Sequence, residues 1–71
     1  MKTVRNILIE LLDKKNDVVI VKYNGNSIMS GYAHDVYWGT SVFLRNCNAT
    51  VESYVEHGIE VNEITIKDGE L

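Results

Sequence analysis

Hydrophobic residues near the N-terminus recur with the spacing of one face of an α-helix. They stand at positions i, i+3, i+4, i+7 and i+8 of one segment, as Val4, Ile7, Leu8, Leu11 and Leu12. Thr3 is a suitable N-cap before them, and Lys14 and Lys15 suit the negative end of the helix dipole. The pattern therefore predicts an amphipathic helix over about residues 3–15.

The spacing changes to that of β-strands further along the chain. Residues 18–23 form a β-branched run without polar alternation until its end, which predicts a strand that is covered on both faces. Asn24-Gly25 follows, a pair that tolerates the positive φ angles of a tight hairpin turn. The next strand is expected over about residues 27–37, and Gly31 allows it to bend sharply because glycine has no Cβ.

Three further strands are expected in the second half of the chain. A compact apolar segment predicts a short strand over about residues 40–46. Strict alternation over about residues 50–61 predicts a long strand with one apolar side and one acidic side. Asn62 and Glu63 would then turn the chain into a last short strand over about residues 64–67.

These elements predict one mostly-β domain that comprises residues 1–71. A helix followed by five strongly bent antiparallel strands is typical of a small barrel, with the helix packed across the open end. Periodicity alone leaves SH3-like and OB-type barrels open as alternatives. A membrane-surface role for the helix is disfavoured because its polar side carries charges of both signs.

Composition narrows the class of protein. The chain has 71 residues, and at this length folding buries only about 60% of the surface of the unfolded chain. Its single cysteine excludes a disulfide framework, so we expect oligomerisation to provide additional burial and a reducing, cytoplasmic location. The N-terminus lacks the pattern of a signal peptide, and no segment has the roughly twenty apolar residues of a membrane span.

No catalytic or metal-binding motif stands out. The sequence has no Gly-rich phosphate loop and no recognisable acid/base carboxylate pair, and no histidine stands at a motif-like offset from Cys47. Two histidines and one cysteine without paired ligand spacing do not indicate a zinc site. We therefore expect no enzyme activity and no cofactor. The net charge of −3 repels phosphate at long range, so nucleic-acid binding would need a local site.

The central segment resembles the first motif of Sm-like proteins. That motif has an Asn-Gly turn, a strand glycine and, six residues further on, an Asp followed by x-x-Met-Asn-Leu-x-Leu. Gly31 takes the place of the strand glycine, Tyr37 that of the Asp, and residues 40–44 those of the last five motif positions. Downstream, residues 55–59 resemble the Lys-His-Ala-Ile segment of the bacterial Sm-like protein Hfq, with Glu56 at the lysine position.

This resemblance implies an assembly and an RNA site. The assembly is a homo-oligomeric ring of about five to seven subunits, closed by edge pairing between the fourth and fifth strands of neighbours. In Sm-like rings the pore holds uridine-rich RNA by stacking, by Asn contacts to a base edge and by a basic residue. Carried over by position, Gly39 takes the stacking position, Ser41 the base-reading position and Asn62 the basic position. All three differ in chemistry from the family residues.

Three other residues are candidates for the same site. Trp38 and Tyr37 offer aromatic surfaces on which bases can stack, and His57 aligns with the Hfq histidine that reaches the pore. The alternative for each is structural. The two aromatic residues would then pack in the barrel or at an interface, and His57 would be a satisfied histidine at the end of a strand.

Two functions are therefore expected. The first is a ring that binds short single-stranded RNA, rich in U or A, at its pore and acts in RNA metabolism. The alternative is a structural or protein-interaction ring that has lost RNA binding, which the acidic charge and the changed signature residues favour. A pore lined by Glu56, Glu60 or Glu63 would favour the second function. One lined by Arg45, Lys22 and Trp38 would favour the first.

Overall fold

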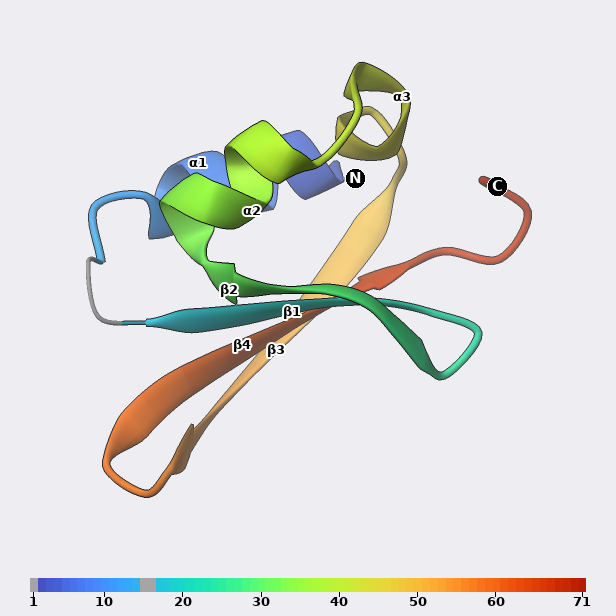
Figure 1. Cartoon of the computed structure of the whole chain (residues 1–71). Helices are drawn as coiled ribbons and strands as arrows, with labels where there is room; N and C mark the ends of the chain where they lie inside the picture. The colour runs from blue at the N-terminus through green and yellow to red at the C-terminus, as the bar shows by residue number, and fades with distance from the viewer. Residues whose placement is uncertain (1, 15–16) are drawn as a thin grey trace.

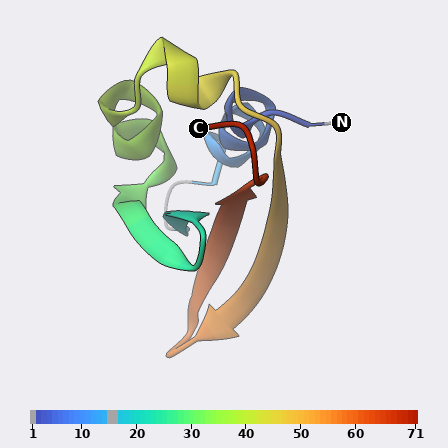
Figure 2. The ribbon, with the colours of Figure 1, turned by 90° about the vertical axis from the view of Figure 1, so that its right-hand side faces the viewer.

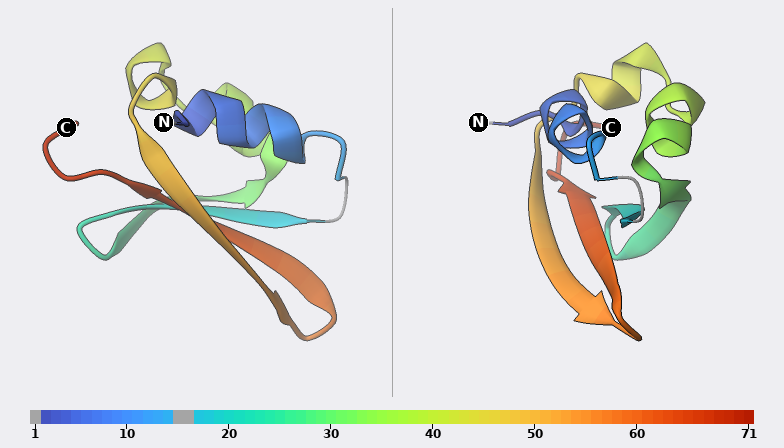
Figure 3. Two further views of the ribbon diagram at one scale, coloured as in Figure 1. Left: turned by 180° about the vertical axis from the view of Figure 1, so that it is seen from behind. Right: turned by 90° about the vertical axis from the view of Figure 1, so that its left-hand side faces the viewer.

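A computed structural model describes residues 2–14 and 17–71, and within them the chain forms helices on one side of a twisted sheet (Figure 1). The β3–β4 hairpin extends beyond the helices (Figures 1 and 3). The elements, in chain order, are α1 (Val4–Leu11), β1 (Val18–Tyr23), β2 (Asn26–Tyr32), α2 (Ala33–Gly39), α3 (Val42–Arg45), β3 (Ala49–Glu56) and β4 (Ile59–Ile66).

The N-terminal helix forms as predicted, with Thr3 as its N-cap. Thr3 Oγ1 accepts a hydrogen bond from the Asn6 N–H at 3.2 Å, and Asn6 Oδ1 accepts one from the Thr3 N–H at 3.1 Å. The two bonds form a capping box. The predicted apolar stripe is buried at Val4, Ile7, Leu8 and Leu11. The helix is shorter than expected because it ends at Leu11, and Lys15 lies outside the described residues.

The first strand and the turn after it are also confirmed. β1 has the predicted bounds, and Asn24 and Gly25 take φ angles of 51° and 77° in the turn to β2. The expected strand over residues 27–37 is wrong beyond Tyr32, where α2 begins. Ala33 and Val36 lie one helical turn apart and are both buried, so a helix places both in the core.

The expected strand over residues 40–46 is also wrong, because residues 42–45 form the short helix α3. Ser41 precedes it, and its hydroxyl oxygen accepts a hydrogen bond from the Leu44 N–H at 3.1 Å. This is the N-cap interaction for which serine is preferred. Arg45 lies in the last turn, where a positive charge stabilises the helix dipole.

The long strand expected over residues 50–61 is instead a hairpin of β3 and β4. His57 and Gly58 take φ angles of 53° and 78° and form its two-residue turn, so the expected turn at Asn62 and Glu63 is wrong. The expected strand over residues 64–67 is the end of β4. The reversal also changes the face that odd-numbered residues occupy. Val55 pairs with Glu60 and Tyr54 with Val61, so Val55 and Val61 lie on opposite faces.

The strands pair in the order β2-β1-β4-β3, and β1 and β4 are parallel. The other two pairs are antiparallel. Within the described residues, the structure therefore has a four-stranded mixed sheet in place of the expected five antiparallel strands. The sheet is open, with β2 and β3 at its edges, in place of the expected closed barrel (Figure 2). Closure is lost because segments expected to continue the sheet fold as α2 and α3.

The core lies between the helices and the near face of the sheet. Its fully buried members include Leu8 of α1, Val19 and Val21 of β1 and Ile64 of β4. Burial of one such side chain stabilises the fold by about 1.5–3 kcal/mol relative to leaving it exposed. The opposite face of the sheet has no helix over it in the described part of the chain (Figure 3).

Truncation at the centre of this core is expected to be costly. Ile64→Ala should lower the free energy of unfolding by about 2–5 kcal/mol, because the lost burial is accompanied by a cavity. Val42→Ala is the matched control, since Val42 is 66% exposed and its truncation should change stability by less than about 0.5 kcal/mol. Urea unfolding followed by circular dichroism measures both changes. Equal losses would contradict the assignment of the core.

Candidate functional site

The residues expected at an RNA site are divided among three places. Tyr37, Trp38 and Gly39 belong to α2, and Ser41 caps α3. The other two residues, His57 and Asn62, belong to the β3–β4 hairpin. The structure thus brings four of the six expected residues together and separates them from the other two.

The aromatic residues of α2 form a small exposed cluster. Trp38 is 69% exposed, and its ring centroid lies 5.1 Å from that of Tyr37 and 6.5 Å from that of His34, both in edge-to-face contact. The Arg45 guanidinium lies over the Tyr37 ring at 4.7 Å, and Arg45 Nη1 donates a hydrogen bond to the Tyr37 carbonyl at 3.2 Å. Trp38 is the largest ring of this cluster and is mostly exposed.

Two of the expected residues have structural roles next to this cluster. Gly39 lies where α2 contacts β2, and a Cβ at this position would lie 2.8 Å from Cε at the flexible end of Met29. The Ser41 hydroxyl is engaged as the N-cap of α3. Neither residue therefore presents a free base-reading or stacking group.

Asn62 is 1% exposed and connects three strands. Its Oδ1 accepts a hydrogen bond from Ser53 Oγ of β3 at 2.6 Å, and its Nδ2 donates one to the Val18 carbonyl of β1 at 3.3 Å. A buried amide requires such partners, because an unsatisfied one costs about 1–3 kcal/mol. In the folded chain this side chain is part of the sheet and is not accessible to a ligand.

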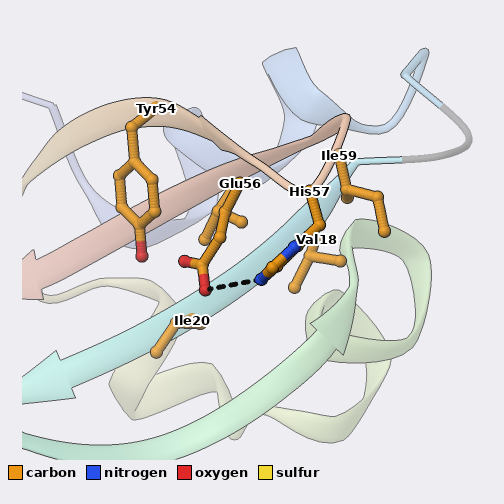
Figure 4. Close-up of a pocket in the computed structure, with 7 residues that line it drawn as sticks. Val18, Ile20, Tyr54, Glu56, His57 and Ile59 are labelled. Atoms are coloured by element: carbon orange, nitrogen blue, oxygen red, sulfur yellow. Dashed lines mark ion pairs between the residues drawn. The ribbon is translucent and has the colours of Figure 1, made fainter.

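His57 lies at the rim of a shallow hollow on the face of the sheet that the helices leave uncovered (Figure 4). The hollow has a volume of about 230 Å³. Val18 and Ile20 form its floor, and the hairpin residues stand above them (Figure 4). The full lining is Val18, Ile20, Tyr54, Glu56, His57, Ile59 and Val61.

The first strand shows why this hollow exists. Its β-branched run predicts cover on both faces, but only the helix-facing Val19 and Val21 are fully buried. Val18 and Ile20, which point to the other face, remain partly exposed. The prediction of two-sided cover is therefore wrong for the single chain, and an apolar strip lies uncovered on the open face.

Acidic groups surround this apolar strip. Glu56 and His57 face each other at its rim, with Oε1 and Nε2 4.0 Å apart (Figure 4). Further along the same face, Glu52 pairs directly with Glu63 in the β3–β4 register. Lys22 Nζ lies 2.9 Å from Glu63 Oε1, so one of these two carboxylates is neutralised. The open face thus combines branched apolar residues with excess negative charge.

Contacts of Glu63 with Lys22 and Tyr54 shift pKa values on this face. Hydrogen bonds from Lys22 and then Tyr54 hold the pKa of Glu63 below its ordinary value. The Tyr54 hydroxyl donates its hydrogen bond to this carboxylate, which raises the pKa of Tyr54 to about 12. The Tyr54 hydroxyl therefore acts as a hydrogen-bond donor on this face at neutral pH.

The thiol of Cys47 is not activated as a nucleophile. It is buried, and burial followed by the nearby Glu70 carboxylate raises its thiol pKa. Among residues 2–14 and 17–71, no three His, Cys, Asp or Glu side chains lie together as a metal ion would require. None of the helices in this part of the chain is long and apolar enough to cross a membrane.

Comparison of the chain with protein-family models, with curated proteins and with solved structures found no match. The resemblance to Sm-like proteins therefore stays a prediction. Sequence reasoning found His57 and Trp38 as candidates but missed the hollow. The signal was present in Val18 and Ile20, whose side chains occupy the opposite face from Val19 and Val21.

The hydrogen bond between Tyr54 and Glu63 gives a pH-dependent prediction. Glu63→Gln should move the pKa of Tyr54 from about 12 back toward 10, because the negative acceptor is lost. Since the folded-state pKa of Tyr54 is raised, its contribution to stability is present below pH 10 and is lost as pH rises through 12. Ultraviolet titration of tyrosinate measures the shift, and Tyr54→Phe identifies the signal. An unchanged titration in Glu63→Gln would contradict the contact.

Proposed function

We propose that this chain is a non-enzymatic protein-interaction module. Its open sheet face would bind a short apolar segment of another protein that carries lysine or arginine. The single observation that carries this proposal is the apolar hollow over Val18 and Ile20, with Glu56 in its lining and two more carboxylates further along the same face. A cytoplasmic location, expected from the single cysteine, is part of the same proposal.

Both the shape and the charge of the open face support a peptide ligand. A hollow of about 230 Å³ is small for a cofactor and accommodates one or two branched aliphatic side chains. Glu52 makes no ion pair with another described residue, and the side chain directly opposite it is a second glutamate. Because Lys22 already pairs with Glu63, a cation supplied by a partner would pair with Glu52.

The distribution of basic residues favours a protein ligand over RNA. Lys2, Lys14 and Lys22 are each within 4.0 Å of a glutamate carboxylate. The Arg45 guanidinium lies over Tyr37. These three ion pairs and the net charge of −3 weaken the attraction for phosphate, which supplies most of the affinity in non-specific nucleic-acid binding.

Single-stranded RNA remains a second candidate ligand, at a different place. Exposed Trp38 carries this proposal, because bases of every kind stack on aromatic rings. A ring of about five to seven Sm-like subunits would gather several copies of Trp38 at one opening and is part of this second proposal.

Two peptides of opposite charge test the first proposal. Both contain the same isoleucine and valine residues, and one is flanked by lysines and the other by glutamates. The lysine peptide should bind at least about tenfold more tightly at low salt, because it complements the carboxylates of the open face. Calorimetry gives the affinities, and amide NMR shifts at Ile20 and Ile59 locate the site.

Charge reversal provides the matched control for this experiment. Glu56→Lys should remove the preference for the lysine peptide, whereas Asp68→Lys, with the same change in net charge, should retain it. Asp68 lies in the C-terminal segment beyond β4. Equal binding of the two peptides to the unmodified chain, or an equal effect of the two variants, would contradict the proposal.

Trp38 makes the second candidate directly measurable, because it is the only tryptophan in the chain. Stacking of oligo-U or oligo-A on Trp38 should quench its fluorescence, and Trp38→Ala should weaken binding by at least about fivefold. Phe43→Ala is the control, since Phe43 is an exposed aromatic residue of the neighbouring helix. Oligonucleotide binding that is equally strong in Trp38→Ala would contradict this site.

A further inference from the structure

The outer edge of β3 is covered at one end and free along the rest. Near its start, the N-terminal segment pairs with it through a bridge between Thr3 and Asn48. The Ala49 N–H also donates to the Lys2 carbonyl at 3.0 Å. No such bond is present beyond Ala49 in the described chain, so residues 50–56 form a free strand edge.

This free edge exposes hydrogen-bonding groups of the backbone. The Ala49 N–H donates to the Lys2 carbonyl, which shows that it points away from β4. Backbone direction alternates along a strand, so the N–H and C=O groups of Val51, Ser53 and Val55 point outward too. Solvent-facing edges of this kind are templates for pairing with another strand.

β3 also lacks the features that usually protect an edge strand. It contains no proline or lysine, and it pairs with β4 over its full length without a bulge. The other edge strand, β2, also contains no proline or lysine but is protected in two other ways. Its register with β1 is broken between Val21 and Lys22, and it continues directly into α2.

The charges on β3 restrict how two copies can pair. A two-fold axis perpendicular to the sheet relates the two copies and keeps every side chain on its own face. Residues that face each other across the new edge must lie on the same face, so the axis passes between the two copies of one residue, on which the pairing is centred. Centring on Glu52 places the two Glu52 side chains opposite each other. Centring on Tyr54 places Glu52 opposite Glu56 twice, and like charges directly opposite are destabilising. Centring nearer either end pairs fewer of the free residues.

Centring on Ser53 avoids every like-charge pair. Glu52 then faces Tyr54 of the second copy, and Thr50 faces Glu56. Val51 faces Val55 on the other side of the sheet, where both are exposed in the single chain. Ser53 is also the midpoint of the free segment 50–56. Pairing centred on Ser53 therefore avoids like-charge contacts and also pairs every residue of the free segment.

We propose that two copies of this chain pair through β3, antiparallel and with the two-fold axis at Ser53, to form one continuous eight-stranded sheet. Val51, Ser53 and Val55 would contribute three hydrogen-bonded pairs and about six backbone hydrogen bonds. This inference is independent of the proposed ligand of the open face, because edge pairing leaves that face uncovered.

Engineered cysteines test the register of this pairing. Ser53→Cys should form an intermolecular disulfide on mild oxidation, because paired residues at the axis have Cα atoms about 5.5 Å apart. Val55→Cys is the matched control and should form no intermolecular disulfide, because the two copies of residue 55 in the dimer do not face each other. Cys47 is buried and is kept in both variants. Linking of Val55→Cys but not Ser53→Cys would overturn the register.

Opposite charges at one position test the dimer in solution. Thr50→Glu creates two like-charge contacts with Glu56 and should raise the dimer dissociation constant about fivefold, whereas Thr50→Lys should lower it. Thr65→Glu and Thr65→Lys carry the same charges on the central strand β4 and should have smaller effects. Sedimentation equilibrium of the full chain across the micromolar range measures all five proteins. A mass of one chain throughout, or of a larger ring unaffected at Thr50, would overturn the proposal.

Discussion

Apolar side chains of α1 pack against the two central strands, where Val19, Val21 and Ile64 are completely buried. These strands, β1 and β4, are parallel neighbours, so the chain must pass from one edge of the sheet to the other between them. α2 and α3 lie within that connection, on the same side of the sheet as α1 (Figure 1). All helical cover is consequently placed on one face, which leaves the other face and the β3 edge exposed.

Local signals were sufficient for the first third of the fold. The apolar stripe of α1, the Thr3 cap and the Asn24-Gly25 turn each depend on residues close together in sequence. The second third was mispredicted because short helices compete with strands in apolar segments. Ala33 and Val36 showed a helical spacing, but over too few residues to outweigh the expectation of a bent strand. α3 depends on one capping interaction that alternation does not reveal.

The candidate site was predictable only in part, because it depends on a chain reversal and on pairing between distant strands. His57 was identified as a candidate, but its positive φ marks a turn, and continuous alternation concealed the reversal there. The reversal moves Ile59 and Val61 to the open face, beside Val18 and Ile20. No single segment of sequence shows this hollow, since it requires the parallel pairing of β1 and β4. Long-range pairing of this kind is what periodicity leaves undetermined.

The free edge and the open face meet at β3, where Tyr54 and Glu56 belong to both. Pairing at the edge adds a strand within the plane of the sheet, so it satisfies backbone groups without covering the hollow. In the proposed dimer two hollows would lie on one continuous face, with Glu52 of each copy next to Tyr54 of the other. The negative potential of each hollow would then be reinforced by its neighbour, which increases the attraction for a positively charged segment. A ligand with two such segments would gain further affinity from binding both hollows at once.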